Sequence, residues 1–499
     1  MKRETMLTID IGTSSARAAV FQADGSAAGL SQIKYDVLRP APFMEEQEPD
    51  AIRRAVYEVV QICLAQPGVR PDAVRGIVFS SQMYSVFPID ADGRPLCNSI
   101  LWSDGRAEDE AAALRAENRH DALYRETGCP VNSIYPLSKI LWLRDRQPDL
   151  CARAARFVSI KEYVLEPLIS DWVTDYSMAS GTGMFDGSKD VWSPLALETA
   201  GVAEDRLPRL VPGDQPLEFR NDELRRAWGL SSGVKVFSGG GDGPLANLGS
   251  GAFAPGDVNV DLGTSGALRV VADSPVLDSQ GRLWRYSIAP GRWAFGGILS
   301  NVGNAWQWLA SNIAAFQSDE KPEETVKRLS ALAADVPMGA EGVYFLPYLR
   351  KARAPYWDDR LRGTVFGLTA AHDTRHLARA MLEAIAFDLA EIIDIASRQV
   401  AVSPVLILTG GLSQSVIVPQ LLADVMNRDI VIPDHSEGSL AGAAIVGLKG
   451  AGLIDDFAFV RSGERPQKRI VSDRARHERY NAQRAKYASL VAAIRDITL

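Results

Sequence analysis

The chain has 499 residues, which favours two or three domains, and 46% hydrophobic and 23% charged residues are typical of a globular protein. A formal net charge of −8 with no basic block argues against a nucleic-acid-binding protein. No run of about 18 apolar residues predicts a transmembrane helix, so no membrane partner is expected. The start, MKRETMLTID, lacks the apolar stretch of a secretion signal. We therefore expect a cytoplasmic protein.

Cysteine and histidine usage gives no metal signature. The four cysteines are widely spaced and form no C-x-x-C pair, which predicts reduced thiols. His372 and His376 are separated by one helical turn, but no H-E-x-x-H pattern accompanies them. That spacing favours the start of a helix over a zinc site.

The first predicted unit is a strand, a turn and a second strand near the N-terminus. Residues 6–10 (MLTID) form the expected strand, residues 12–15 (GTSS) the turn and residues 17–21 the second strand, followed by an Asp24-Gly25 hairpin signal. Hydroxyls and a glycine at the tip can offer several donors to a phosphate. The chain has neither a Walker A sequence nor G-x-G-x-x-G, so P-loop and Rossmann folds lack support.

A helix at residues 48–64 and a strand at residues 74–80 come next, and the strand runs into SSQMYS at residues 80–85. Farther along, an apolar strand end is followed by a Trp-x-Asp-x-Arg cluster at residues 102–106. An aromatic face, an acceptor and a fixed charge together suit a polyhydroxylated ligand. The alternative is an Asp–Arg ion pair beside a core tryptophan.

The stretch at residues 236–270 organises the rest of the chain. It holds six glycines in the fourteen residues from Ser238 to Gly251, with Asp242 set among them. Glycines let the backbone approach a ligand closely, so Asp242 either meets substrate or caps the following helix. The stretch ends in DLGTSGALR (residues 261–269), a near copy of DIGTSSAR at residues 10–17. This repeat at about half the chain length indicates two similar domains, with the boundary at residues 236–245.

The second half alternates strands and helices. We expect a helix opening at residues 301–308 and a strand at residues 341–349, then a long helix capped by Asp373 or Thr374 with Asp388 at the edge of its apolar stripe. A buried strand at residues 404–411 ends in Gly-Gly and precedes a helix at residues 415–427, and an amphipathic helix at residues 473–497 closes the chain. The Gly-Gly turn either places N–H groups near a nucleotide or is an ordinary strand–helix turn.

Several segments, in this order, resemble the FGGY family of carbohydrate kinases. They are DIGTSSAR, WSDGRA (residues 102–107), PLSKILWL (136–143), GGGDG (239–243), DLGTSG (261–266), FLPYL (345–349) with RAPYWDDRLRGTVFGLT (353–369), LTGGLSQS (408–415) and EGSLAGAA (437–444). The resemblance covers nearly the whole chain. It implies two α/β domains with the actin-like (ribonuclease H-like) fold, each a mixed five-stranded sheet with flanking helices, around a central cleft. Residues 1–240 are the expected sugar-binding domain and residues 241–499 the expected ATP-binding domain.

The resemblance also implies roles for particular residues in phosphoryl transfer from ATP. Asp242 is the expected catalytic base and also contacts substrate, and Asp10 is the expected Mg²⁺ ligand, acting through water. The expected phosphate-binding residues are Gly12, Thr13, Ser14 and Arg17 in the first domain and Gly263, Thr264, Ser265 and Gly266 in the second. The expected ATP-binding residues are Gln307, Gly410, Gly411 and Ser415. The expected sugar contacts are Gln82, Met83, Tyr84, Trp102, Asp104 and Arg106.

The substrate is less well defined than the chemistry. Segments 159–163 and 174–184, with DGPLANLGSG and GTSGALR, look most like gluconate kinases, whereas GGGD and Ser81-Gln-Met83 favour xylulose kinases. Tyr84 stands where many members have histidine, and PLSKILWL matches only part of the family's first signature.

D-Gluconate is therefore the first expectation and D-xylulose, or another ketose or polyol, the alternative. A sugar-binding regulator without turnover is a third reading. For a sugar acid, Arg106, Lys139 or Lys161 are candidates to pair with the carboxylate. Family members are often dimers, so a homodimer is an open expectation.

Overall fold

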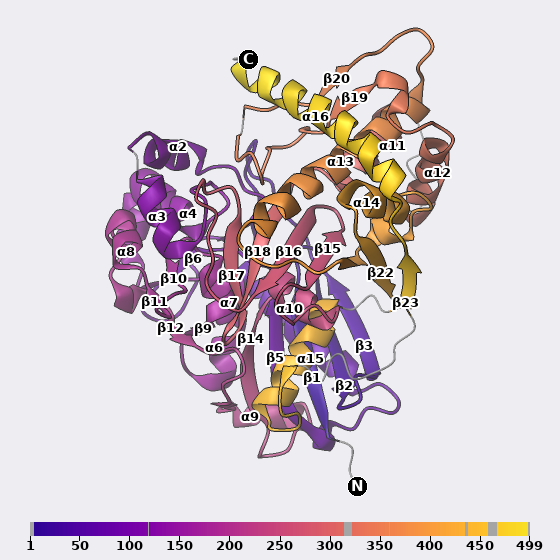
Figure 1. Ribbon diagram of the computed structural model, residues 1–499. Coiled ribbons are helices and arrows are strands. Elements are labelled where there is room, and N and C mark those ends of the chain that lie inside the picture. Colours follow the sequence, from indigo (N-terminus) through magenta and orange to yellow (C-terminus); the bar gives the residue numbers. More distant parts are fainter. Residues whose placement is uncertain are drawn as a thin grey trace.

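The computed structural model describes residues 4–117, 119–313, 322–358, 360–434, 438–457 and 467–497. Two α/β domains are each built on a mixed sheet with helices around it, and the sheet of the second domain lies above that of the first in Figure 1. The sheets have six and seven strands among the described residues, not five, because additional edge strands extend each of them. None of the described helices is long and apolar enough to span a membrane.

The first sheet has the order β13-β14-β5-β1-β2-β3. β14, β5 and β1 are parallel, while β1, β2 and β3 form an antiparallel meander with Asp10 opposite Arg17. Every residue of β1 is buried, as expected for a strand covered on both faces. The strands are β1 (Thr5–Ile11), β2 (Ser15–Gln22), β3 (Ala27–Lys34), β5 (Val74–Ser81), β13 (Leu217–Glu218) and β14 (Lys235–Gly241).

Helices from both halves of the chain cover this sheet. α1 packs on one face against β2 and β3, and α15, from the second half, packs on the other against β1 and β5. The first-half helices are η1 (Pro71–Ala73), η2 (Glu204–Arg206), α1 (Pro49–Leu64), α2 (Glu108–Ala116), α3 (His120–Thr127), α4 (Pro136–Arg146), α5 (Pro148–Arg153), α6 (Ile160–Ile169), α7 (Tyr176–Ser180), α8 (Pro194–Ala200), α9 (Asp222–Ala227) and α10 (Asp242–Gly249).

The second sheet has the order β17-β18-β16-β15-β21-β22-β23, with β15, β21 and β22 parallel and the other neighbours antiparallel. Its strands are β15 (Val258–Leu262), β16 (Gly266–Ala272), β17 (Trp284–Ala289), β18 (Arg292–Leu299), β21 (Val405–Thr409), β22 (Asp429–Pro433) and β23 (Gln467–Ile470). The helices of this half are η3 (Ala340–Gly342), η4 (Gly411–Gln414), α11 (Gly303–Asn312), α12 (Pro322–Ala334), α13 (Thr374–Ser397), α14 (Val418–Met426), α15 (Gly438–Gly450) and α16 (Arg474–Asp496). α16 crosses the top of the domain in Figure 1.

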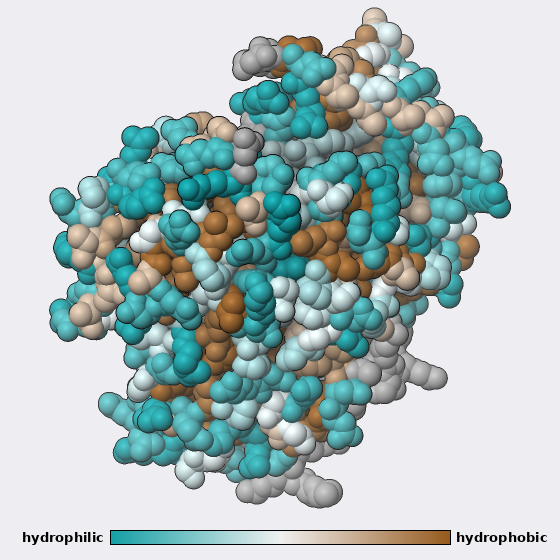
Figure 2. All heavy atoms as spheres, turned by 60° about the vertical axis from the view of Figure 1, so that its left-hand side comes forward, coloured by the Kyte–Doolittle hydropathy of each residue, from teal (hydrophilic) through white to brown (hydrophobic). Residues whose placement is uncertain are grey.

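Both domains also contain small two-stranded sheets. In the first they are β4 (Glu46–Gln47) with β7 (Ser99–Ile100), β6 (Phe87–Ile89) with β8 (Arg156–Val158), β9 (Val173–Asp175) with β12 (Arg209–Val211), and β10 (Phe185–Asp186) with β11 (Val191–Trp192); in the second, β19 (Tyr344–Leu346) pairs with β20 (Thr364–Phe366). On the face shown in Figure 2 the surface is mostly hydrophilic, and hydrophobic side chains gather in separate patches.

α10 and α15 form the closest link between the two halves. A Cβ on Gly442 would lie 1.9 Å from the Leu245 carbonyl oxygen, and one on Gly249 would lie 1.9 Å from the Gly438 carbonyl oxygen. Only glycine permits backbones this close. The glycines of the central stretch and of LAGAA therefore seat the helix that leads out of Asp242 against the second half of the chain.

Most predicted elements are confirmed, with two corrections. Asp373 caps α13, as expected, and His376 belongs to its first turn. Asp388 is not at the edge of the apolar stripe: it is buried and accepts hydrogen bonds from Tyr348, Tyr356 and Tyr487, which compensate a carboxylate in the core. The strand expected at residues 341–349 is confined to β19, since η3 forms the preceding turn. The motif residues Asp359 and Glu437 lie outside the described residues.

Candidate active site

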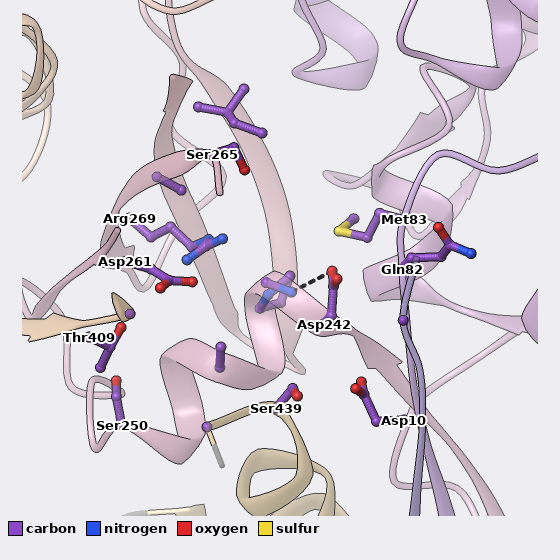
Figure 3. Close-up of a pocket in the computed structure, with 18 of the residues that line it drawn as sticks. Asp10, Gln82, Met83, Asp242, Ser250, Asp261, Ser265, Arg269, Thr409 and Ser439 are labelled. Atoms are coloured by element: carbon purple, nitrogen blue, oxygen red, sulfur yellow. Dashed lines mark hydrogen bonds between the residues drawn. The ribbon is translucent and has the colours of Figure 1, made fainter. Parts of the chain in front are cut away.

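A cleft of about 740 Å³ lies between the two domains. Strand ends of both sheets and the first turn of α10 line it, and Asp242 stands at its centre (Figure 3). The predicted residues that line it are Asp10, Gly12, Thr13, Arg17, Gln82, Met83, Tyr84, Trp102, Asp242, Ser265, Gly410 and Gly411. The cleft thus brings together residues from both halves of the sequence, and its size falls within the ordinary range of ligand sites.

Asp10 lies at the end of β1 and is almost fully buried. Arg17, opposite it on β2, donates two hydrogen bonds to Oδ2 at 2.7 and 3.1 Å, and the Ser80 hydroxyl donates to Oδ1 at 2.6 Å. Both oxygens therefore have protein partners, and the carboxylate is held at one edge of the cleft. A carboxylate oxygen has more than one lone-pair site, so each can accept a further bond.

Thr13 connects the first turn to the predicted sugar segments. Its hydroxyl donates to Gln82 Oε1 at 3.1 Å and accepts from Trp102 Nε1 at 3.0 Å. Gln47 closes the network, since it donates to the Thr13 carbonyl and accepts from Gln82. The turn, Gln82 and Trp102 thus form one hydrogen-bonded wall. Ser14, in the same turn, is outside the lining.

Asp242 begins α10 directly after β14. Its Oδ1 accepts a hydrogen bond from the Gly243 amide at 2.8 Å. Burial, and then the nearby charge of Asp10, raise the pKa of Asp242 to about 7. A carboxyl with this pKa can exchange a proton near neutral pH, which is the property required of a general base.

The predicted sugar segment is held by a buried lysine. Lys139 on α4 donates to the carbonyls of Tyr84 and Leu101, each at 2.7 Å, and burial lowers its pKa to about 7. Tyr84 has a left-handed backbone (φ 68°), and its hydroxyl donates to that of Tyr286 at 3.2 Å. Lys139 therefore ties two segments that line the cleft, those carrying Tyr84 and Trp102.

The other two cations predicted for a substrate carboxylate are engaged inside the first domain. Arg106 binds Asp104 and Glu46, and the Arg106–Asp104 pair is buried behind the cleft wall. Asp104 also accepts from the Glu45 amide at 2.6 Å. Lys161 pairs with Asp175 in the interior. In the Trp-x-Asp-x-Arg cluster only Trp102 lines the cleft, so the ion-pair alternative describes the other two residues.

Three predicted phosphate residues of the second turn, Gly263, Thr264 and Gly266, lie beside the lining. The carbonyls of Gly263 and Thr264 accept from the amides of Gly303 and Asn304, so the start of α11 supports the turn. Ser265 projects into the cleft (Figure 3). The roles of these residues stay predictions.

Two predicted ATP residues lie away from the lining of the cleft. Gln307 is exposed on α11, and Ser415 is buried, where its hydroxyl accepts from amides at the start of α14. Gly410 and Gly411 do line the cleft, together with residues that no motif singled out for this role: Ser250, Asp261, Arg269, Trp284, Tyr286, Thr409, Gln414 and Ser439. Asp261 and Arg269 lie within the second copy of the repeat, and comparison with Asp10 and Arg17 of the first copy could have indicated that they line the cleft.

Comparison with known proteins agrees with this architecture. The model of the FGGY family of carbohydrate kinases, N-terminal domain, matches residues 5–249, and that of the C-terminal domain matches residues 258–451. The chain belongs to the FGGY family of carbohydrate kinases. It is therefore a phosphotransferase acting on a carbohydrate, and kinases of this family use ATP.

The individual relatives include kinases of two different substrates. The chain is 35% identical over 466 residues to a gluconokinase of Bacillus licheniformis, covering 91% of this chain and 89% of the relative. A gluconate kinase and a ligand-bound xylulose kinase of Lactobacillus acidophilus each superpose with a TM-score of 0.92 at 26% identity, covering 99% of both chains. Overall shape thus does not separate these two substrates.

Proposed function

We propose that this kinase phosphorylates D-gluconate on its 6-hydroxyl, with ATP as donor, to give 6-phosphogluconate. The observation that carries the proposal is Asp242, a buried carboxyl with a pKa near 7 at the centre of a cleft lined by both domains. The choice of gluconate is supported by sequence identity, which is 35% to a gluconokinase and 27% to a xylulose kinase of Lactococcus lactis.

In the proposed reaction Asp242 accepts the proton of the acceptor hydroxyl. The hydroxyl oxygen then bonds to the γ-phosphorus while the bond from phosphorus to the β–γ bridging oxygen breaks, and ADP leaves. A positioned base contributes about 10²–10⁴-fold to such a step. The turns at residues 12–14 and 263–266 hold the phosphates from opposite domains, with Arg17 adding charge. Closure of the two domains excludes water, which would otherwise take the phosphoryl group.

Asp10 is the proposed Mg²⁺ ligand. Each of its oxygens already accepts a bond from Arg17 or Ser80, so the protein offers one carboxylate edge at this position and not a cage. That donor set fits Mg²⁺, which keeps several waters and binds one or two carboxylates plus substrate phosphates. When bound, the ion neutralises phosphate charge during transfer.

The test is release of ADP by purified protein with Mg-ATP and a panel of gluconate, xylulose, ribulose, glycerol and erythritol. Gluconate is expected to give the highest kcat/KM. A higher value for xylulose would transfer the proposal to the ketose, for which the TM-score of 0.92 to a xylulose kinase is the supporting observation. Binding of a sugar with no ADP from any acceptor would favour a regulator.

A further inference from the structure

A second arginine of the cleft, Arg269 on β16, has no ion-pair partner among the described residues. It lines the cleft, and the one hydrogen bond of its guanidinium in the described structure goes to Asn259 Oδ1 at 3.4 Å. Asn259 is buried and itself donates to Thr409 at 3.1 Å, so it holds the guanidinium by one edge. A guanidinium has five N–H donors, and most of those of Arg269 remain available toward the cleft.

The guanidinium also lies against the start of α10. A Cβ built on Gly243 would lie 2.8 Å from Arg269 Nη2 and 3.2 Å from Cζ, so the arginine packs directly on this glycine. The N-terminus of a helix carries partial positive charge from its free N–H groups. Two positive groups are therefore held together at one spot, and this arrangement is favourable when an anion binds there.

The position of Arg269 indicates which anion. Its charge acts on Asp242 and also on Tyr84 in the predicted sugar segment. Arg269 and Trp284 both lie opposite Gly296 of β18, and Trp284 stacks on Tyr286, the partner of Tyr84. Figure 3 shows Arg269 and Asp10 on opposite sides of Asp242. Arg269 thus belongs to the acceptor side of the base, whereas Arg17 stands beside Asp10.

We propose that Arg269 binds the carboxylate of the acceptor and makes the enzyme select sugar acids over neutral polyols. The inference rests on the proposed function, since gluconate is an acid. The cations expected from the sequence, Arg106, Lys139 and Lys161, are held by carboxylates or carbonyls of the first domain. Arg269 instead offers a planar pair of donors, which matches a carboxylate in a two-bonded geometry.

The experiment compares D-gluconate with D-glucitol, in which a hydroxymethyl group replaces the carboxylate. The variants are Arg269→Met and Arg269→Lys, with Arg209→Met as matched control, since Arg209 is an exposed arginine paired with Asp171 far from the cleft. Affinity for each acceptor is measured by calorimetry without nucleotide, and kcat and KM by ADP release. Circular dichroism and Tm establish that each variant is folded.

Arg269→Met is expected to weaken gluconate binding at least ~10-fold, with Arg269→Lys in between, and to raise the ratio of kcat/KM for glucitol over gluconate by a similar factor. The control should match wild type. If Arg269→Met does not fold, Gly243→Ala serves as the second variant, because its Cβ displaces the guanidinium, and it should weaken gluconate binding in the same direction.

Two results would overturn the proposal. Unchanged gluconate affinity with an equal loss of kcat for every acceptor would place Arg269 on the transferred phosphoryl group. Unchanged affinity and unchanged kcat would make it structural. Both leave the proposed function intact if wild type still prefers gluconate, whereas preference of wild type for a neutral acceptor in the panel defeats the proposed function itself.

Discussion

The two copies of the D-x-G-T-S segment both form a hairpin, but the side chains that contact their aspartates differ. In the first, Asp10 is bonded to Arg17 and Ser80. In the second, the Asp261 carboxylate lines the cleft without a hydrogen-bond or ion-pair partner among the described residues, and the Arg269 guanidinium bonds Asn259 instead. In the first wall of the cleft, formed by the hairpin of Asp10 and Arg17, the charged side chains are therefore paired with each other. In the second wall, formed by the hairpin of Asp261 and Arg269, they are unpaired among the described residues and can bind a ligand.

Two differences cause this: the second turn is one residue shorter, and Arg269 follows Asp261 by eight residues, whereas Arg17 follows Asp10 by seven. Strand pairing resumes at Ala16 in the first hairpin, across a turn of residues 12–15, and at Gly266 in the second, across residues 263–265. The shorter turn puts Ala267, not an arginine, opposite Asp261. Because side chains of a strand alternate between faces, Arg269 stays on the face of Ala267 but two residues farther along. A turn as long as the first would put Leu268 opposite Asp261, so the shorter turn and the later arginine together place Arg269 on the face of Ala267, beyond the aspartate.

The largest effect is expected between these walls, at Asp242. Asp242→Asn removes the proposed base and should lower kcat by about 10²–10⁴-fold with little change in acceptor affinity. Because only the carboxylate accepts a proton and its pKa is raised to about 7, kcat/KM of wild type should fall about tenfold for each pH unit below 7. Steady-state rates from pH 5 to 9 check both points.

Asp388→Asn is the matched control, since Asp388 is also buried with a pKa raised to about 7 by burial but lies in the core of the second domain. It should keep both the rate and the acid limb. A wild-type acid limb that persists in Asp242→Asn would remove Asp242 from the role of base.

The sequence predicts the parts of this picture that depend on local pattern. The repeat around Asp10 and Asp261, the helix cap at Asp373 and the glycine-rich approach to Asp242 all follow from residue type and spacing. Contacts between residues distant in sequence could not be predicted from local pattern. Nothing near Asp388 indicates three tyrosines, and the register that separates Arg269 from Arg17 depends on turn geometry, which similar sequences conceal.

Substitutions at Arg17 and Asp261 compare the two hairpins directly. Arg17→Met removes the charge-assisted bonds to Asp10 and should lower kcat/KM for ATP by about 10–100-fold. Asp261→Asn breaks no side-chain hydrogen bond or ion pair among the described residues and should lower it by less than about 10-fold. Kinetics at saturating acceptor measure both. A larger loss for Asp261→Asn than for Arg17→Met would contradict the inference that the paired charges of the first hairpin matter more for ATP than the unpaired carboxylate of the second.

Lys139→Met tests the bracing of the first wall. It removes the lysine bond to the Tyr84 carbonyl and one of two bonds to the Leu101 carbonyl, which still accepts from the Asp104 amide at 3.2 Å, and an unpaired buried group costs about 1–3 kcal/mol. We expect KM for the acceptor to rise about 10-fold with kcat changed less than about 3-fold, because Lys139 positions cleft residues without lining the cleft. Lys189→Met, which removes an exposed lysine paired with Asp186 outside the cleft lining, is the control. An unchanged KM would show that the wall holds without Lys139.

The smallest effect is expected in the core of the second domain. Tyr487→Phe removes the hydrogen bond to Asp388 (3.1 Å) and the one shared with the Tyr348 hydroxyl (3.0 Å), and should lower the free energy of unfolding by about 1–2 kcal/mol without affecting kinetics. Since the folded pKa of Asp388 is raised above its ordinary value of 3.8, the folded state binds more protons, and stability falls as pH rises from about 4 to 7. The Tyr487 bond lowers that pKa, so its loss raises the pKa further, and the deficit of the variant should grow with pH up to and beyond 7.

Urea unfolding at pH 5 and 8 measures this, with Tyr176→Phe as control because that hydroxyl has no hydrogen-bond partner among the described residues. A deficit equal at the two pH values would mean that the Tyr487 hydroxyl stabilises the core through its bond to Tyr348 and not through the charge of Asp388.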